Sequence, residues 1–143
     1  MARYTASVQT QKGPQEVFDY LSDFSNAREW DPGVLEAERL GGGPVSDGTE
    51  FRLVAKFLGR SNTLVYRVVE LDPPSAVSFR GENQSVVSLD RITFQPHGTG
   101  TTVTYDADLK LKGPLKLADP LLAIAFKRVG DQALGGLRRQ LAA

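Results

Sequence analysis

The stretch ADPLLAIAFKRVGDQALGGLRRQLAA, residues 118–143, decides the fold of this chain. Asp119 is a good N-cap and Pro120 suits the first helical position, where a missing N–H costs nothing. Beyond them, apolar residues recur at the helical spacing of three to four, namely Leu122, Phe126, Val129, Ala133, Leu137 and Leu141. The pattern predicts one amphipathic helix from Asp119 to the C-terminus, roughly 35 Å long. Such a helix needs an apolar surface to lie on.

Two glycines, Gly135 and Gly136, interrupt this helix near its end. Each glycine in a helix interior costs up to about 1 kcal/mol relative to alanine, so the pair calls for an explanation. One interpretation is a close approach between the helix and a strand. The other is a hinge that lets the end of the helix swing open for a ligand.

The chain upstream of the helix indicates strands joined by turns. Apolar and polar residues alternate over residues 3–12, which predicts a half-buried first strand. Two short helices should follow, over residues 14–23 and 25–30. Further strands are predicted over residues 34–40, 49–58, 61–71, a segment after Ser75, 85–95 and 101–112.

The alternation also predicts how the strands pair. A turn at Gly59-Arg60 would place Phe57 opposite Asn62 and Leu53 opposite Tyr66, which keeps apolar residues on one face. The next pairing aligns Val68 with Phe79, and Glu70 with Val77. In the last hairpin, Ile92 lies opposite Tyr105, Asp90 opposite Ala107 and Ser88 opposite Leu109.

These elements define an α+β fold in one domain, residues 1–143. Seven antiparallel strands form a sheet with one apolar face, and the long C-terminal helix is the element able to cover it. The two short helices lie between the first and second strands.

Composition excludes several classes of protein. The 143 residues carry a formal net charge of zero, whereas a nucleic-acid binder should carry a basic excess. The sequence has no cysteine and one histidine, so we expect no metal site and no cofactor. The first residues lack the apolar region of a signal peptide, and no apolar run reaches the length of a membrane span. We therefore expect a cytoplasmic protein without stable membrane insertion; the sequence leaves its oligomeric state open.

Asp90 is the most informative single residue, because a carboxylate on the inward face of a sheet is costly unless it is paired or reaches a water-filled cavity. Asp90, Ser88, Tyr66 and Tyr105 are predicted to form the polar part of a pocket. The alternatives are a β-bulge that turns Leu89 inward and Asp90 outward, or an ion pair with an arginine.

Four other residues have two interpretations each. Asn62 and Glu70 could line the mouth of a pocket or be solvated strand ends. Trp30 could contact a ligand or fix the short helices to the sheet. His97, in a tight turn, could be simply exposed, which we expect, or have a catalytic or metal-binding role.

Several short motifs, taken together and in order, resemble one superfamily across essentially the whole chain. They are Gly13-Pro14-x-x-Val17-Phe18-x-x-Leu21-Ser22-Asp23, Trp30-Asp31-Pro32-Gly33, Gly48-Thr49, Leu71-Asp72-Pro73-Pro74 and Gly100-Thr101. With the element order they resemble the START-like, or helix-grip (SRPBCC), superfamily, which includes the polyketide cyclase/dehydrase and lipid transport family. The resemblance implies a curved sheet wrapped around the long helix, with a cavity between them that usually holds an apolar ligand.

The resemblance supports fold more strongly than function, because one fold hosts many activities. The first hypothesis is binding of a hydrophobic small molecule, lipid-like or aromatic. The second is a polyketide cyclase or dehydratase with Asp90 as the candidate catalytic residue, and the third is a stress-response or interaction domain with an incidental cavity. The expected ligand-binding residues are Leu53, Ala55, Phe57, Tyr66, Val68, Phe79, Ser88, Asp90, Ile92, Tyr105, Leu122, Phe126 and Val129.

Overall fold

A computed structural model describes residues 2–57, 59–113 and 119–142, with the side chains of residues 119–122 left out. Within this part of the chain, seven strands form one antiparallel sheet in the order β1-β7-β6-β5-β4-β3-β2. The strands are β1 (Ala2–Thr10), β2 (Val34–Leu40), β3 (Glu50–Phe57), β4 (Arg60–Asp72), β5 (Ala76–Glu82), β6 (Val86–His97) and β7 (Gly100–Leu111). The helices are α1 (Pro14–Ser22), the short 3-10 helix η1 (Phe24–Asn26), α2 (Ala27–Trp30) and α3 (Asp119–Ala142).

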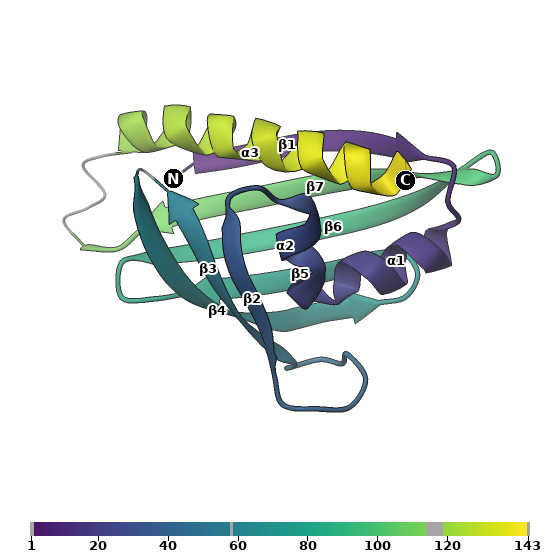
Figure 1. The fold of residues 1–143 in the computed structure, drawn as a ribbon, viewed down its shortest axis with the longest axis horizontal. Coiled ribbons are helices and arrows are strands. Elements are labelled where there is room, and N and C mark those ends of the chain that lie inside the picture. The colour runs from purple at the N-terminus through teal and green to yellow at the C-terminus, as the bar shows by residue number, and fades with distance from the viewer. Residues whose placement is uncertain (1, 58, 114–118, 143) are drawn as a thin grey trace.

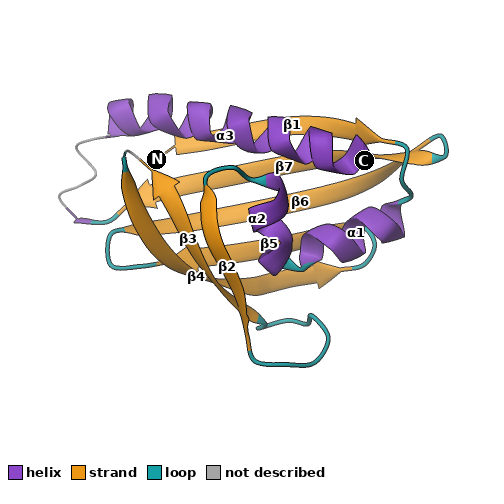
Figure 2. Ribbon diagram, in the orientation of Figure 1, coloured by secondary structure: helices purple, strands orange, loops and turns teal. Residues whose placement is uncertain are grey.

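The helices lie on one side of the sheet (Figure 2). Figure 1 shows α3 running beside β1, while α1 and α2 lie in front of the middle strands and β2 and β3 bend forward around them. The sheet therefore curves around the helices and leaves its other face to solvent. This arrangement confirms the α+β, helix-wrapping architecture expected from the element order.

The long C-terminal helix forms as the apolar spacing predicts. Ala133, Leu137 and Leu141 are buried, and Leu134 joins them. Phe126 and Val129 are partly buried near the beginning of the helix. Burial of this stripe is the main source of stability for a helix that borders water on its other faces.

Strand pairing agrees with the sequence in the last hairpin. Ile92 lies opposite Tyr105, Asp90 opposite Ala107 and Ser88 opposite Leu109. Between β4 and β5, Val68 lies opposite Phe79, also as predicted. These registers place the polar residues of β6 on the concave face.

The predicted strand pairing is wrong at two places, the first between β3 and β4. Phe57 pairs with Arg60 rather than Asn62, and Leu53 pairs with Leu64 rather than Tyr66. The chain reverses before Arg60, helped by Gly59, whose φ of 75° lies in the left-handed region that glycine favours. The slip is two residues, so every side chain keeps its predicted face.

The second error, between β4 and β5, moves one side chain to the other face of the sheet. A bulge between Val68 and Glu70 sets Leu71, not Glu70, opposite Val77. The extra residue turns Glu70 to the outer face. There Arg91 and Ser78 both donate hydrogen bonds to Glu70 Oε1, at 3.0 and 2.6 Å.

An aromatic cluster fills one end of the concave face. The Phe24 ring stacks on Phe79 with a centroid distance of 4.2 Å and meets Tyr66 edge-on at 5.1 Å. Phe18 meets Phe94 edge-on at 5.4 Å. These contacts anchor α1 and η1 to β4, β5 and β6.

The glycine pair in α3 has a structural explanation at one position. A Cβ at Gly136 would lie 1.8 Å from the carbonyl oxygen of Trp30, so only glycine permits this approach. The contact is with the end of α2 and not with a strand, which corrects the first interpretation. Gly135 has only the tip of Arg139 near it, at 3.8 Å from the added Cβ.

This difference yields a matched pair of variants. We expect Gly136→Ala to lower the free energy of unfolding by about 1–3 kcal/mol, because α3 must move away from α2. Gly135→Ala should raise it by up to about 1 kcal/mol, because alanine has the higher helix propensity and meets no obstacle. Urea unfolding followed by circular dichroism measures both. Equal effects of the two substitutions would contradict the close-approach explanation.

Candidate functional site

A cavity of about 150 Å³ lies between the concave face of the sheet, the end of α2 and α3. Its walls are mostly apolar. The described residues that line it are Tyr4, Phe24, Ala27, Trp30, Asp31, Val34, Leu53, Ala55, Lys56, Phe57, Asn62, Leu64, Tyr66, Val86, Ser88, Asp90, Tyr105, Ala107, Leu109, Phe126, Val129, Gly130, Ala133 and Leu134. An apolar cavity with a few polar groups is typical of small-molecule sites.

Asp90 of β6 supplies the best-fixed polar group of this cavity. Its side chain is buried, with 8% exposure, whereas Leu89 beside it is 42% exposed. The carboxylate therefore points inward, as predicted, and no bulge reverses it. Ser88 Oγ donates a hydrogen bond to Asp90 Oδ1 at 2.8 Å, and the Tyr105 hydroxyl donates to Asp90 Oδ2.

Asp31 is a second carboxylate in the cavity wall, and the sequence analysis did not propose it as a site residue. It follows α2 directly, and its Oδ1 accepts a hydrogen bond from the backbone N–H of Gly33 at 2.9 Å. This bond closes a turn that leads into β2 and fixes the carboxylate beside Trp30. Its place in the Trp30-Asp31-Pro32-Gly33 motif was the available signal, because that motif is one of those that carry the family resemblance.

The environment raises the pKa of both carboxyl groups. Burial raises the pKa of Asp31 to about 6, and the negative charge of Asp90 adds to the effect, against the Gly33 hydrogen bond. Burial also raises the pKa of Asp90, although the hydrogen bonds from Tyr105 and Ser88 oppose the rise. Among the described residues no cation contributes to either shift.

The two tyrosines beside these carboxylates remain neutral. Burial is the main cause of the raised pKa of Tyr66 and of Tyr105, and the Asp90 charge raises both further. Tyr66 lies across from Gly81 in the neighbouring strand, where an added Cβ would come within 2.4 Å of its ring. Gly81 therefore gives the ring its space, as a positioning residue.

The structure brings together most of the residues proposed from the sequence. Nine of them line the cavity: Leu53, Ala55, Phe57, Tyr66, Ser88, Asp90, Tyr105, Phe126 and Val129. Val68, Phe79 and Ile92, by contrast, lie in the packed core with at most 1% exposure. For Phe79 the reason is Phe24, whose ring stacks on it and covers that end of the concave face. The side chain of Leu122 falls outside the described part of the structure.

The residues with two interpretations are also placed. Asn62 lines the cavity, whereas Glu70 is on the outer face because of the bulge. The Trp30 ring packs on Phe24 and Tyr105, so it fixes the short helices to the sheet. It also forms part of the cavity wall, where it could contact a ligand. His97 is exposed at the end of β6.

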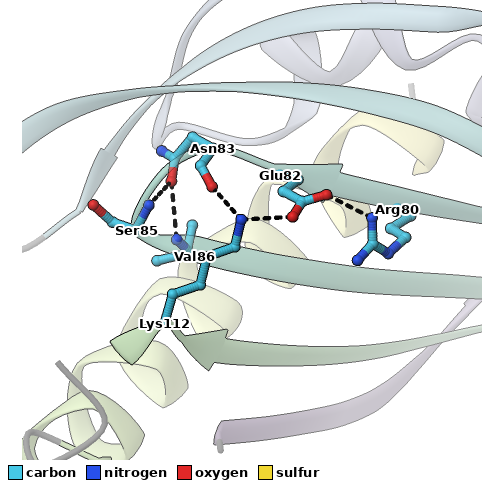
Figure 3. Close-up of polar contacts among 6 residues, drawn as sticks. All are labelled: Arg80, Glu82, Asn83, Ser85, Val86 and Lys112. Carbon is cyan, nitrogen blue, oxygen red and sulfur yellow. Dashed lines mark hydrogen bonds and ion pairs between the residues drawn. The ribbon is translucent and has the colours of Figure 1, made fainter. Parts of the chain in front are cut away.

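A polar network fixes the strand ends next to one lining residue, Val86 (Figure 3). Lys112 Nζ donates to Glu82 Oε2 and to the Asn83 carbonyl at 2.5 and 2.7 Å. Asn83 Oδ1 accepts from the backbone N–H of Val86 at 2.9 Å. Hydrogen bonds from Lys112 and Arg80 lower the pKa of Glu82. The network thus joins the turn between β5 and β6 to the residue that follows β7.

Two further kinds of site were sought in the described residues. No three His, Cys, Asp or Glu side chains in that part of the chain come together as metal ligands. None of its helices combines the length and apolar character that crossing a membrane requires.

Comparison with known proteins assigns the family. Residues 1–142 match the family described as polyketide cyclase / dehydrase and lipid transport, and the chain belongs to that family. No curated protein is similar enough in sequence to count as a match.

Several solved structures share the fold. A START superfamily protein from Mycobacterium smegmatis is 15% identical, with 99% of this chain and 97% of that chain covered and a TM-score of 0.82. An aromatase/cyclase from Streptomyces sp. R1128 is 17% identical, with coverage of 97% and 92% and a TM-score of 0.81. A protein from Thermus thermophilus is 19% identical, with coverage of 98% and 95% and a TM-score of 0.79. At such identities the likeness concerns the fold.

The raised pKa of Asp31 predicts a pH-dependent cost in stability. The folded protein holds this proton more tightly than the unfolded chain, so the cost is small below about pH 4 and complete above about pH 6. We expect Asp31→Asn to stabilise the protein by about 2–3 kcal/mol more at pH 8 than at pH 4, because the amide oxygen keeps the Gly33 hydrogen bond. Urea unfolding at the two pH values measures this. Asp47→Asn, in the exposed loop after β2, is the control; an equal response of both variants would contradict the prediction.

The Gly81–Tyr66 contact predicts a coupled pair. Gly81→Ala should lower the free energy of unfolding by about 1–3 kcal/mol, because the new methyl group displaces the Tyr66 ring. In a Tyr66→Leu background the same substitution should cost much less. A double-mutant cycle from urea unfolding measures the coupling. Additive effects would show that Gly81 does not position Tyr66.

Proposed function

We propose that this protein binds a small, mostly apolar molecule in the cavity between the sheet and α3. The observation that carries the proposal is the cavity itself: about 150 Å³, with mostly apolar walls and the carboxylates of Asp31 and Asp90 among its lining groups. Well-packed interiors leave few voids of that size, because empty space forfeits packing interactions. A retained void with polar groups is better explained by an occupant.

The volume limits what the cavity holds without rearrangement. An engineered protein cavity of about 150 Å³ takes up benzene, so one aromatic ring or an aliphatic body of that size fits. A longer chain would have to extend out of the cavity. Membership in a family named for polyketides and lipid transport supports ligands with such an apolar body.

An enzyme of the cyclase or dehydratase type is the second candidate. Asp31 favours it, because a carboxyl group with a pKa of about 6 in an apolar cavity is suited to move protons near neutral pH. The fold shared with an aromatase/cyclase is consistent with this. Asp31 is a better candidate for the proton-transferring group than Asp90, which already accepts hydrogen bonds from Ser88 and Tyr105.

The binding proposal can be tested with phenethyl alcohol as a neutral probe. Trp30 is the only tryptophan of the sequence and forms part of the cavity wall, so its fluorescence reports occupancy. We expect saturable binding and a one-to-one complex in native mass spectrometry. Ala133→Leu, which places a larger side chain in the cavity, should weaken the affinity about tenfold or more.

The control for this experiment is Ala123→Leu, which enlarges an exposed residue of the same helix. It should leave the affinity unchanged. If no neutral aromatic probe binds, and no small molecule is retained by the freshly purified protein, the binding proposal is wrong. If Ala133→Leu leaves the affinity for the probe unchanged, the probe binds elsewhere on the protein.

A further inference from the structure

Two carboxyl groups line the cavity, Asp31 and Asp90, and no described cation pairs with either of them. Asp31 and Asp90 come from different parts of the fold, the end of α2 and the middle of β6, yet both line the same cavity. They are near enough for the charge of Asp90 to raise the pKa of Asp31. A carboxylate in an apolar cavity is costly unless something pairs with it.

Two hydroxyl groups beside these carboxylates already donate hydrogen bonds. Ser88 and Tyr105 both direct their hydroxyl protons to Asp90. On Asp31, Oδ1 accepts from the Gly33 backbone. Besides the Tyr66 hydroxyl, what this part of the cavity offers a ligand is therefore mainly the acceptor oxygens of two carboxyl groups.

The other elements around the cavity add no cation to its interior. From α3 the described lining residues are Phe126, Val129, Gly130, Ala133 and Leu134, none of which is charged. From β1, Tyr4 directs its hydroxyl to Asp131 at 2.7 Å, on the exposed face of α3. Lys56 of β3 is the one cation among the described lining residues, but it is exposed and alternates with the inward-facing Ala55 and Phe57.

We propose that the cavity selects a molecule with an apolar body and a protonated amino group, and that the ammonium lies between the carboxylates of Asp31 and Asp90. This inference rests on the proposed binding function and names the ligand class. An ammonium supplies the positive charge that the two carboxylates lack, and it adds further hydrogen-bond donors. A ligand with a carboxylate would add a third negative charge to the same space and is disfavoured.

The same arrangement makes amine binding depend on pH. Below about pH 6 a proton occupies Asp31 and competes with the ammonium, so affinity for an amine should rise as pH increases through that value. The groups that face Asp31 across the cavity are Asp90, Tyr66 and Tyr105, and the two tyrosines stay neutral over this range. A neutral ligand of the same shape should show a much weaker dependence.

Three probes with one phenyl ring and different polar ends test the inference: phenethylamine, phenethyl alcohol and phenylacetate. Affinities are measured by Trp30 fluorescence and by native mass spectrometry, at about pH 7.5 and about pH 5. At the higher pH we expect the amine to bind about tenfold or more tightly than the alcohol, and phenylacetate to bind most weakly. The ratio of amine to alcohol affinity should fall severalfold at the lower pH.

Asp31→Asn tests the role of the carboxylate itself. It should reduce the amine-to-alcohol ratio toward one and remove its dependence on pH, while Asp47→Asn on the exposed loop leaves the ratio unchanged. If the alcohol binds and the amine binds no better, or if phenylacetate binds most tightly, this inference is overturned and the binding function stands. If none of the three probes binds, the binding function itself fails.

Discussion

The close contact between Gly136 of α3 and the Trp30 carbonyl at the end of α2 is the constraint on which the cavity depends. It fixes the C-terminal half of α3 at a distance that no side chain would allow. A second glycine contact lies nearer the N-terminal end of α3. There Gly130 faces the Tyr4 ring, and an added Cβ would come within 2.6 Å of it. Between the two contacts the helix presents Ala133, too small to fill the concave space beneath it. The void is thus a consequence of where the helix is held and of the small residues it carries.

The polar groups in that void work against stability. A cavity lined only by apolar residues would avoid the cost of two carboxylates with raised pKa values. Ser88 and Tyr105 reduce the cost at Asp90, whereas among the described residues Asp31 accepts one hydrogen bond, from the Gly33 backbone. Local features that oppose folding are concentrated at functional sites. Asp31 and Asp90 therefore indicate a binding site more strongly than the apolar lining residues do, although the apolar residues are more numerous.

The sequence predicted the faces of the strands better than their partners. Period-two alternation decides whether a side chain points inward, so Leu53, Tyr66, Asp90 and Tyr105 were placed correctly. A slip of two residues preserves that alternation, so the alternation does not distinguish the observed β3–β4 register from the predicted one. The register is set instead by the geometry of the turn. The bulge before Glu70 had no signal in the alternation, and it alone moved Glu70 to the outer face.

Strand periodicity does not predict which inward-facing residues belong to the packed core and which line the cavity. Phe79 and Leu53 both point inward. Phe24, from a different part of the chain, stacks on Phe79 and covers it, whereas Leu53 stays in the wall of the cavity. Asp31 was missed for the same reason, because its position follows from a turn after α2 and from the docking of that turn against α3. The composition of a cavity in this fold is set by the segments laid across the sheet. The chemistry that distinguishes one family member from another should therefore be sought in the α1–α2 segment and on α3 as much as in the strands.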